Sequence, residues 1–181
     1  MSAADPFEAF VSAYEDMVFA TAVRLLGNPA EAEDVAQTVF LKAFQRFDAI
    51  RDHPAVAGWL KTVTTNVCLN HLSRYRARWR LFSEMGREDA ESGAAAFEST
   101  IASAVSLADD VERADEQARL ETALRGLPDH QRVPLVLFHF QDRSYQEIAD
   151  LLGVSLGKIK TDIHRGREAL RHELTSDHEP R

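Results

Sequence analysis

The sequence predicts an all-α chain made of two small helical domains, residues 1–80 and 109–181, joined by an acidic linker over residues 81–108. Apolar residues recur at helical spacing through both domains, and no run alternates apolar and polar residues for long enough to indicate a strand. The linker breaks this pattern, because glycine, serine and alanine alternate there with acidic residues. A chain of 181 residues, of which 45% are hydrophobic, is long enough to form two small cores.

Three helices are expected in the first domain. The first runs from about residue 6 to residue 26 and ends at Gly27, a residue type that suits a left-handed helix cap. Asn28 caps the second helix, and the third begins near Pro54 and continues to about Arg80. The expected buried stripes are Val35, Val39, Phe40, Ala43, Phe44 and Phe47 on the second helix, and Val56, Leu60, Val63 and Val67 on the third.

The second domain is expected to begin with two further helices. The first of these runs from about Asp109 to Arg125 and is ended by Gly126. The next helix contains Pro134, which lacks the N–H group that a helix interior needs. Its start is therefore placed late, at about residues 129–131.

A short helix, a tight turn and a long basic helix form the strongest motif of the chain. Ser144 and Glu147 fit a capping box at the start of the short helix, Gly153 makes the turn, and Ser155 caps a helix that runs to about Leu174. This pattern is typical of a helix-turn-helix, whose second helix enters the major groove of DNA. We expect Ile159, Ile163 and Leu170 to face the core, and Lys158, Lys160, Thr161, Asp162, His164 and Arg165 to face outward.

Basic residues gather in two segments, although the formal net charge of the chain is −8. Residues 74–80 hold four arginines and no acid, and residues 158–171 hold five Lys or Arg with two acids. Residues 84–116, in contrast, hold ten acids and two arginines. Since Lys and Arg provide phosphate contacts, the two basic segments are candidate DNA contacts, and the acidic stretch between them indicates separate partner surfaces.

Several classes of protein do not fit the sequence. The single cysteine, Cys68, excludes an internal disulfide, and no Cys/His group has the spacing of a zinc site. There is no glycine-rich phosphate loop and no nucleophile motif, so we expect no enzyme, no cofactor and no metal. A signal peptide and a stretch of ~20 apolar residues are both absent, which favours a cytoplasmic protein that does not cross a membrane.

Two segments carry a resemblance to a known family. Residues 144–171, preceded by the segment 127–137, closely resemble the promoter-binding fourth region of the extracytoplasmic-function sigma factors of bacterial RNA polymerase. Residues 25–44 resemble the second region, which docks on the clamp helices of the polymerase. Residues 58–80 are similar to the part of that region that opens and reads the −10 promoter element. The two matches occur in the order found in the family.

The resemblance implies a subunit that binds core RNA polymerase, through its clamp helices and flap, and directs it to promoter DNA with −35 and −10 elements. An anti-sigma protein is a further candidate partner, because family members are often held by one. For contacts with the −35 element the candidates are Lys158, Lys160, Thr161, His164, Arg165 and Arg167. For the −10 element they are Arg51, His53, Asn66, Asn70, Arg74, Arg76 and Arg78, although Asn66 and Asn70 also fit an ordinary polar helix face. For polymerase binding they are Glu33, Asp34, Gln37, Thr38 and Leu41.

Thr38 departs from the family pattern, because members often carry an acid directly after the glutamine at this point of the second region. Two interpretations stay open. In the first, Glu31, Glu33 and Asp34 compensate for the missing acid. In the second, a kinase modifies Thr38, since a phosphate would add about −1.5 to −2 charges there.

A stand-alone helix-turn-helix regulator is the alternative function. A regulator of the response-regulator type would need an α/β receiver domain, and the first 80 residues show no strands. Comigration with core polymerase distinguishes the two functions, because a simple regulator binds duplex DNA unaided.

Overall fold

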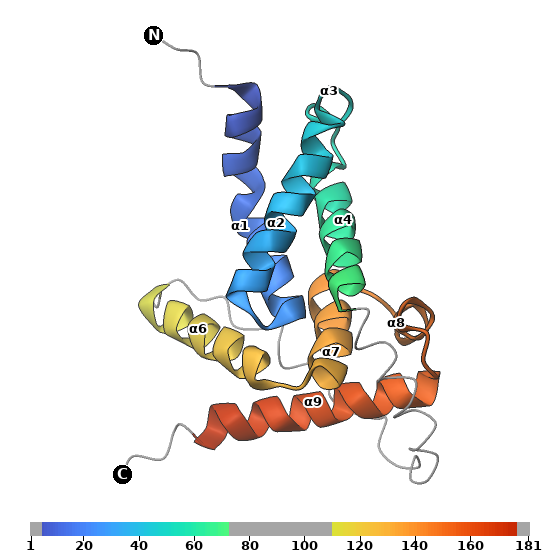
Figure 1. The fold of residues 1–181 in the computed structure, drawn as a ribbon. Coiled ribbons are helices and arrows are strands. Elements are labelled where there is room, and N and C mark those ends of the chain that lie inside the picture. Colours follow the sequence, from blue (N-terminus) through green and yellow to red (C-terminus); the bar gives the residue numbers. More distant parts are fainter. Residues whose placement is uncertain (1–4, 73–109, 177–181) are drawn as a thin grey trace. The chain divides into compact units, whose positions relative to one another are not determined.

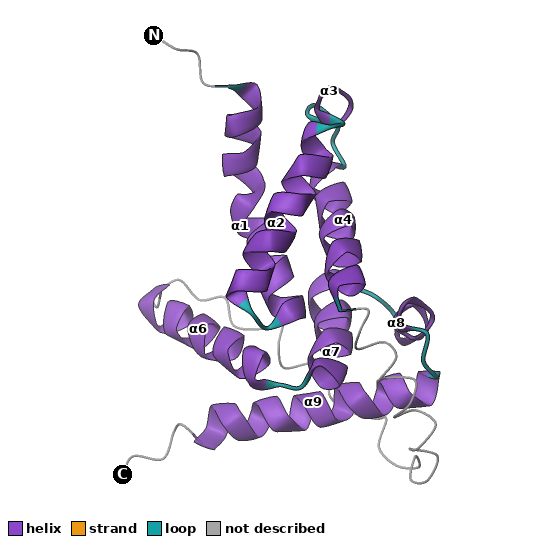
Figure 2. Ribbon diagram, viewed as in Figure 1, coloured by secondary structure: helices purple, strands orange, loops and turns teal. Residues whose placement is uncertain are grey.

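The computed structural model describes residues 5–72 and 110–176, which form two compact units. Within these two ranges every element of regular secondary structure is a helix (Figure 2). The predicted all-α fold is therefore confirmed. The predicted acidic linker and the arginines of residues 74–80 lie outside the described residues.

The first unit consists of α1 (Pro6–Leu26), α2 (Pro29–Phe44), the single-turn α3 (Phe47–Ile50) and α4 (Val56–His71) (Figure 1). Helices α1, α2 and α4 each contact the other two, so they enclose one core between them. The side chains in this core that are essentially inaccessible to solvent include Val18, Leu25, Val39, Leu60 and Leu69.

Local capping residues set the ends of the first two helices. Oδ1 of Asp5 accepts a hydrogen bond from the backbone N–H of Phe7 at 3.0 Å. Gly27 ends α1 in the left-handed conformation with φ of 70°, and Oδ1 of Asn28 then accepts from the N–H of Ala30 at 3.0 Å. The predicted boundary between the two helices is confirmed, because both caps depend on residues within a few positions in the sequence.

The predicted buried stripe of α2 is partly wrong. Val35, Val39 and Ala43 are buried as expected, but Phe40 is only half-buried and Phe44 is 60% exposed. The reason is the helical period. The three buried residues lie four apart along one line, whereas Phe40 and Phe44 each follow a buried residue by one position and so lie about 100° further around the helix.

Phe47 was expected on the same stripe but lies beyond the end of α2, in α3, where it is half-buried. Its ring is 5.2 Å from the ring of Phe7 and 5.4 Å from that of Phe10, in edge-to-face geometry. The ring of Phe44 also meets Phe7, at 4.9 Å. These aromatic contacts join α3 and the end of α2 to the start of α1.

The inner face of α4 also differs from the predicted stripe. Val56 and Leu60 are buried, but Val63 is half-buried, and Thr64 takes the expected core position. Val67 is half-buried in the same way. The buried Thr64 hydroxyl donates a hydrogen bond to the carbonyl of Leu60 at 2.7 Å, so its burial leaves no polar group unsatisfied. The remaining buried residues of this helix are Thr65, Cys68 and Leu69.

The second unit consists of α6 (Asp110–Gly126), α7 (Asp129–Gln141), α8 (Tyr145–Leu152) and α9 (Leu156–Ser176). Helix α9 contacts each of the other three, and α7 also contacts α8 (Figure 1). The most deeply buried side chains of this unit come from all four helices and are Leu124, Val133, Leu135, Leu137, Ile148, Ile159 and Ile163.

The connection between α6 and α7 is held by a buried arginine that the sequence patterns did not reveal. Arg132 is 3% exposed. It donates to the carbonyl of Leu127 at 2.6 Å and forms an ion pair with Asp129. Helix α7 begins at Asp129, within the predicted range, and Pro134 is accommodated inside it.

Candidate functional site

The helix-turn-helix motif is formed as the sequence predicts. The N–H of Glu147 donates to Oγ of Ser144 at 3.2 Å, and the N–H of Ser144 donates to Oε2 of Glu147 at 2.8 Å, which completes the capping box. The hydrogen bond from the Ser144 N–H to its carboxylate is the main reason why the pKa of Glu147 is lowered. Gly153 then ends α8 in the left-handed conformation with φ of 68°, and Oγ of Ser155 accepts from the N–H of Lys158 at 3.2 Å at the start of α9.

The inner face of α9 packs closely on α7. Ile159, Ile163 and Leu170 are buried as predicted. Gly166 is buried as well, and a Cβ atom at this position would lie 3.2 Å from a side-chain carbon of Leu135. The absence of a side chain at Gly166 therefore lets the two helices approach closely.

The outer face of α9 presents basic side chains near its amino end. Lys160, His164 and Arg165 are exposed. Nε2 of His164 lies 3.5 Å from the carboxylate of Glu168, one turn further along. Thr161 is half-buried, and its hydroxyl donates a hydrogen bond to the carbonyl of Gly157 at 3.0 Å. Because the hydroxyl is bonded within the helix, the methyl group is the part of this side chain that remains for other contacts.

Asp162 does not face outward, so that prediction is wrong. Its residue surface is 4% exposed, and Nζ of Lys158 bonds to its Oδ2 at 2.8 Å. The reason is that α9 packs against three helices, which makes its buried face wider than the apolar stripe alone indicates. Residues 158, 162 and 166, spaced four apart, lie along the edge of that face.

Arg167 is also held by the protein itself. Its Nε donates to Nε2 of His139 at 3.1 Å, and its guanidinium lies 5.3 Å from the ring centroid of Phe138. The ring of Phe138 in turn packs against Tyr145 at 4.7 Å. Burial, with a smaller effect of Arg167, lowers the pKa of His139. The structure thus places Arg167 half-buried against α7, whereas Lys160, His164 and Arg165 are exposed.

In the first unit, the four described candidates for −10 contacts are all exposed. Asn66 and Asn70 lie four apart on α4 and share a face. Arg51 pairs with the neighbouring Asp52 at 3.3 Å, and Nδ1 of His53 accepts from the N–H of Ala55 at 3.1 Å, just before α4. The other three candidates, Arg74, Arg76 and Arg78, lie outside the described residues.

The candidate polymerase-binding residues form one exposed face of α2. All five of them, from Glu33 to Leu41, are exposed. The hydroxyl of Thr38 donates to the carbonyl of Asp34 at 3.0 Å.

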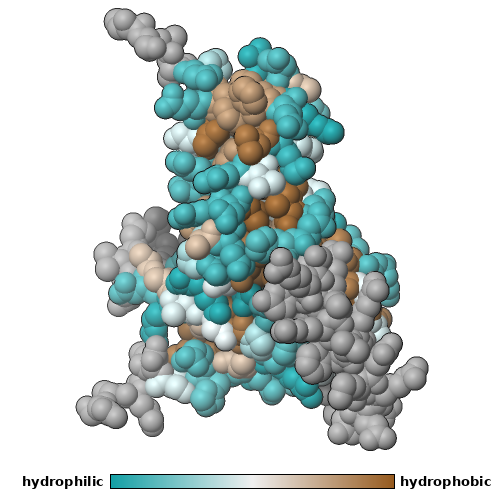
Figure 3. Space-filling view, in the orientation of Figure 1, coloured by the Kyte–Doolittle hydropathy of each residue, from teal (hydrophilic) through white to brown (hydrophobic). Residues whose placement is uncertain are grey.

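Leu41 is 65% exposed and is followed one turn later by the exposed Phe44. Figure 3 shows apolar side chains at the surface of the first unit where α1 begins and α2 ends. Sequence reasoning missed Phe44 as a surface residue, because an aromatic residue at helical spacing is typical of a core.

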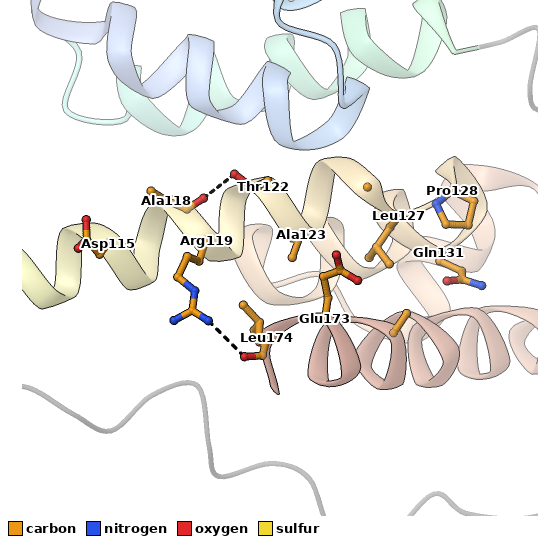
Figure 4. A pocket seen from close by; sticks show the side chains of 12 residues that line it. Asp115, Ala118, Arg119, Thr122, Ala123, Leu127, Pro128, Gln131, Glu173 and Leu174 are labelled. Carbon is orange, nitrogen blue, oxygen red and sulfur yellow. Dashed lines mark hydrogen bonds between the residues drawn. The ribbon is translucent and has the colours of Figure 1, made fainter. Parts of the chain in front are cut away.

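An open groove of about 690 Å³ runs between α6 and α9 in the second unit (Figure 4). Nη2 of Arg119 donates across it to the carbonyl of Leu174 at 3.4 Å. Sequence patterns gave no signal for this groove, because it is made by residues on three separate helices. Its lining includes Ala118, Thr122, Leu127, Gln131 and Glu173.

Residues 5–72 and 110–176 hold few other groups that could bind a metal ion or act as a nucleophile. No cluster of three or more His, Cys, Asp or Glu that could hold a metal ion occurs in these two ranges. Cys68 is buried, and burial raises the pKa of its thiol to about 12. None of the described helices is both long enough and apolar enough to cross a membrane.

Comparisons with known proteins agree with both units. The family described as "Sigma-70 region 2" matches residues 10–78, and "Sigma-70, region 4" matches residues 117–170. The chain is 31% identical to the ECF RNA polymerase sigma factor SigW of Bacillus subtilis, over 94% of this chain and 89% of that protein. It is 32% identical to the RNA polymerase sigma-H factor of Pseudomonas aeruginosa, over 91% and 83% respectively.

A solved structure is also similar: the sigma factor RpoE of Bartonella quintana in complex with the anti-sigma factor NepR. It matches with a TM-score of 0.48 and 23% identity, over 94% of this chain and 98% of that one. The family assignment rests on the two family matches and on the relatives that match over most of both chains. They show that this chain belongs to the extracytoplasmic-function sigma factors, the promoter-recognition subunits of bacterial RNA polymerase.

Proposed function

We propose that the two units divide the work of a sigma factor between them. Residues 1–80 bind core RNA polymerase and engage the −10 element, and residues 109–181 bind the −35 element through α9. The linker of residues 81–108 joins the two. The observation that carries this proposal is that the matches to sigma region 2 and region 4 fall separately on the two folded units. The work requires polymerase and chromosomal DNA, so the cytoplasm is the proposed location.

The exposed amino-terminal part of α9 supports the proposal for the −35 element. In a helix-turn-helix, this part of the second helix meets the edges of the bases. Lys160 and Arg165 carry donors that suit guanine, and the methyl group of Thr161 suits thymine. His164 lies on the same exposed surface. Arg167 is proposed to act from its bonded position beside His139, where it can reach the backbone more readily than a base.

The exposed face of α2 supports the proposal for polymerase docking. Glu33 and Asp34 provide negative charge at one end of this face, and Leu41 and Phe44 provide apolar area at the other. Such a combination fits a partner surface with basic residues around an apolar contact, since charge steers association and buried apolar groups hold it. The clamp helices of the polymerase are the proposed partner for this face. The flap is the proposed partner of the second unit.

The exposed polar residues before and on α4 support the proposal for the −10 element. Arg51 and His53 lie in the loop before the helix, and Asn66 and Asn70 lie along it. Asn side chains and unpaired bases can exchange hydrogen bonds at base edges. The alternative, that these two asparagines form only a solvated helix face, predicts no loss of promoter opening when they are replaced.

A stand-alone regulator is not favoured, because the relatives that match most of the chain are sigma factors. An anti-sigma protein that restrains this chain stays an expectation, as does a kinase that acts on Thr38. Neither is needed for the docking and promoter-reading roles.

Binding to core polymerase tests the proposal. We expect the full chain to comigrate with core polymerase in gel filtration, and Asp34→Ala and Leu41→Ala to weaken this association. Asp16→Ala is a matched control, since Asp16 is an exposed acid on α1 outside the proposed face. If all three variants bind core polymerase as the unmodified chain does, α2 is not the docking face.

A further inference from the structure

Two lysines in the first turns of α9 differ sharply in their surroundings. Lys160 is exposed, whereas the side chain of Lys158 is only 15% exposed and that of its partner Asp162 is 6% exposed. The pair is spaced i, i+4, and the Nζ to Oδ2 distance is 2.8 Å. Lys158 is therefore neutralised by a carboxylate of its own helix, at the end of α9 that would meet DNA.

The surroundings of Asp162 favour this closed pair. Lys158 and Arg165, on the next turn of α9, favour the ionised form of the Asp162 carboxylate, and His130 at the start of α7 does so when it is protonated. Burial raises the pKa of Asp162, and the hydrogen bond from Lys158 opposes this rise. Removing one partner of a buried ion pair leaves the other as an uncompensated buried charge, which is strongly destabilising. The carboxylate therefore needs the ammonium group beside it.

A lysine that is held in such a pair cannot act as a free phosphate contact. Each phosphate that a protein neutralises releases condensed counterions, and this release supplies most of the affinity that does not depend on sequence. A lysine already neutralised by an internal carboxylate adds nothing to that release. If the carboxylate were neutral, the long side chain of Lys158 would be able to extend and keep its charge at the surface.

We propose that Asp162 is a positioning residue that withholds Lys158 from the DNA backbone and so limits the sequence-independent affinity of this sigma factor for DNA. The inference rests on the proposed function, in which α9 lies on the −35 element. It replaces the expectation from sequence that Lys158 contacts DNA directly. The base-reading surface is then left to the exposed residues Lys160, His164 and Arg165.

The test measures how DNA binding depends on salt. Holoenzyme is assembled from core polymerase and the full chain, and a −35 sequence is first selected from random duplexes. Success of this selection tests the proposed function by itself. Affinity is then measured between 50 and 200 mM salt for the selected duplex and for one with a scrambled −35 sequence.

Asp162→Asn preserves the shape of the side chain and removes its charge. We expect the slope of log affinity against log salt to become steeper by about 0.9, the value for one additional phosphate contact. Over this fourfold salt range, the loss of affinity then grows by about 3.5-fold on both duplexes. The ratio of the two affinities stays unchanged, because the added contact does not read bases.

Two further variants complete the test. The double variant Lys158→Met with Asp162→Asn lacks the freed ammonium, so its slope should equal that of the unmodified chain. Arg167→Gln removes the charge that is proposed above to reach the backbone and should flatten the slope by about 0.9, which shows that the assay detects one contact. Circular dichroism establishes that each variant is folded.

Two results would overturn the inference. A flatter slope in the double variant would show that Lys158 contacts phosphate despite its pairing. An unchanged slope in Asp162→Asn would show that Asp162 does not withhold Lys158 from phosphate, and a changed ratio of the two affinities beside it would show that Asp162 reads a base. If Asp162→Asn does not fold, the double variant alone decides, since its slope either equals that of the unmodified chain or is flatter.

Discussion

Arg167 on α9 donates a hydrogen bond from Nε to Nε2 of His139 on α7, at 3.1 Å. This bond requires a neutral imidazole, because a protonated ring has no free nitrogen lone pair. Burial lowers the pKa of His139 from its ordinary value, and the charge of Arg167 lowers it further. The contact between the two helices therefore depends on pH.

The sign of this dependence follows from the lowered pKa. As pH falls, the unfolded chain takes up a proton on His139 before the folded chain does, so the stability contribution is complete above about pH 6.5 and is lost below it. His139→Gln retains an acceptor and does not titrate. We expect the thermal unfolding midpoint of the unmodified chain to fall further than that of this variant between about pH 7.5 and pH 5.5.

The pKa of His130 is also lowered, mainly by burial, so some acid sensitivity should remain in His139→Gln. The difference between the unmodified chain and His139→Gln gives the part of the acid sensitivity that comes from His139. Equal losses of the unfolding midpoint in both would contradict the role assigned to the Arg167–His139 bond.

The capping box of α8 predicts a measurable loss of stability. Ser144→Ala removes the acceptor for the Glu147 N–H and should cost about 1 kcal/mol in the free energy of unfolding. The measurement is urea unfolding followed by circular dichroism. Ser12→Ala, at an exposed position on α1, is the control and should change this free energy little. An equal, small change in both variants would mean that the cap is not formed in solution.

Arg165 should read one base pair. Its side chain is exposed on the part of α9 that meets base edges. Arg165→Ala should cost roughly 1–3 kcal/mol in holoenzyme binding at one position of the −35 element and relax the preference there. The measurement is binding to a set of duplexes that differ at single positions. A uniform loss across all duplexes would assign Arg165 to the phosphate backbone instead.

Substitutions at Thr38 distinguish between the two interpretations of the missing acid on α2. Its hydroxyl is exposed and bonds to the carbonyl of Asp34. If added negative charge strengthens docking, Thr38→Glu should bind core polymerase more tightly than Thr38→Ala. If Thr38→Glu binds no better while Asp34→Ala binds worse, the docking face is right and a phosphorylation switch is wrong.

Features that depend on a few neighbouring residues could be predicted from the sequence. Gly27 and Gly153 adopt the left-handed conformation, and the Ser144–Glu147 box forms, because each needs only residues within one helical turn. The order of the helices followed from these boundaries and from the spacing of apolar residues.

Which face of a helix is buried could be predicted only in part, because it depends on what packs against the helix. Phe44 has the residue type of a core position, but its ring meets Phe7 at the start of α1 and the residue stays 60% exposed. Asp162 has the residue type of a surface position, but the width of the α9 interface buries it. Arg132 is similar, since its partners become visible only once the turn between α6 and α7 is formed.

A sigma factor gives core RNA polymerase its choice of promoters, and this choice can be measured directly. Transcripts made on genomic DNA by core polymerase are sequenced with and without the full chain. We expect a set of start sites that appear only with the chain present and that share one −35 and one −10 sequence. Start sites that are the same with and without the chain, or that share no upstream sequence, would contradict the promoter-reading role.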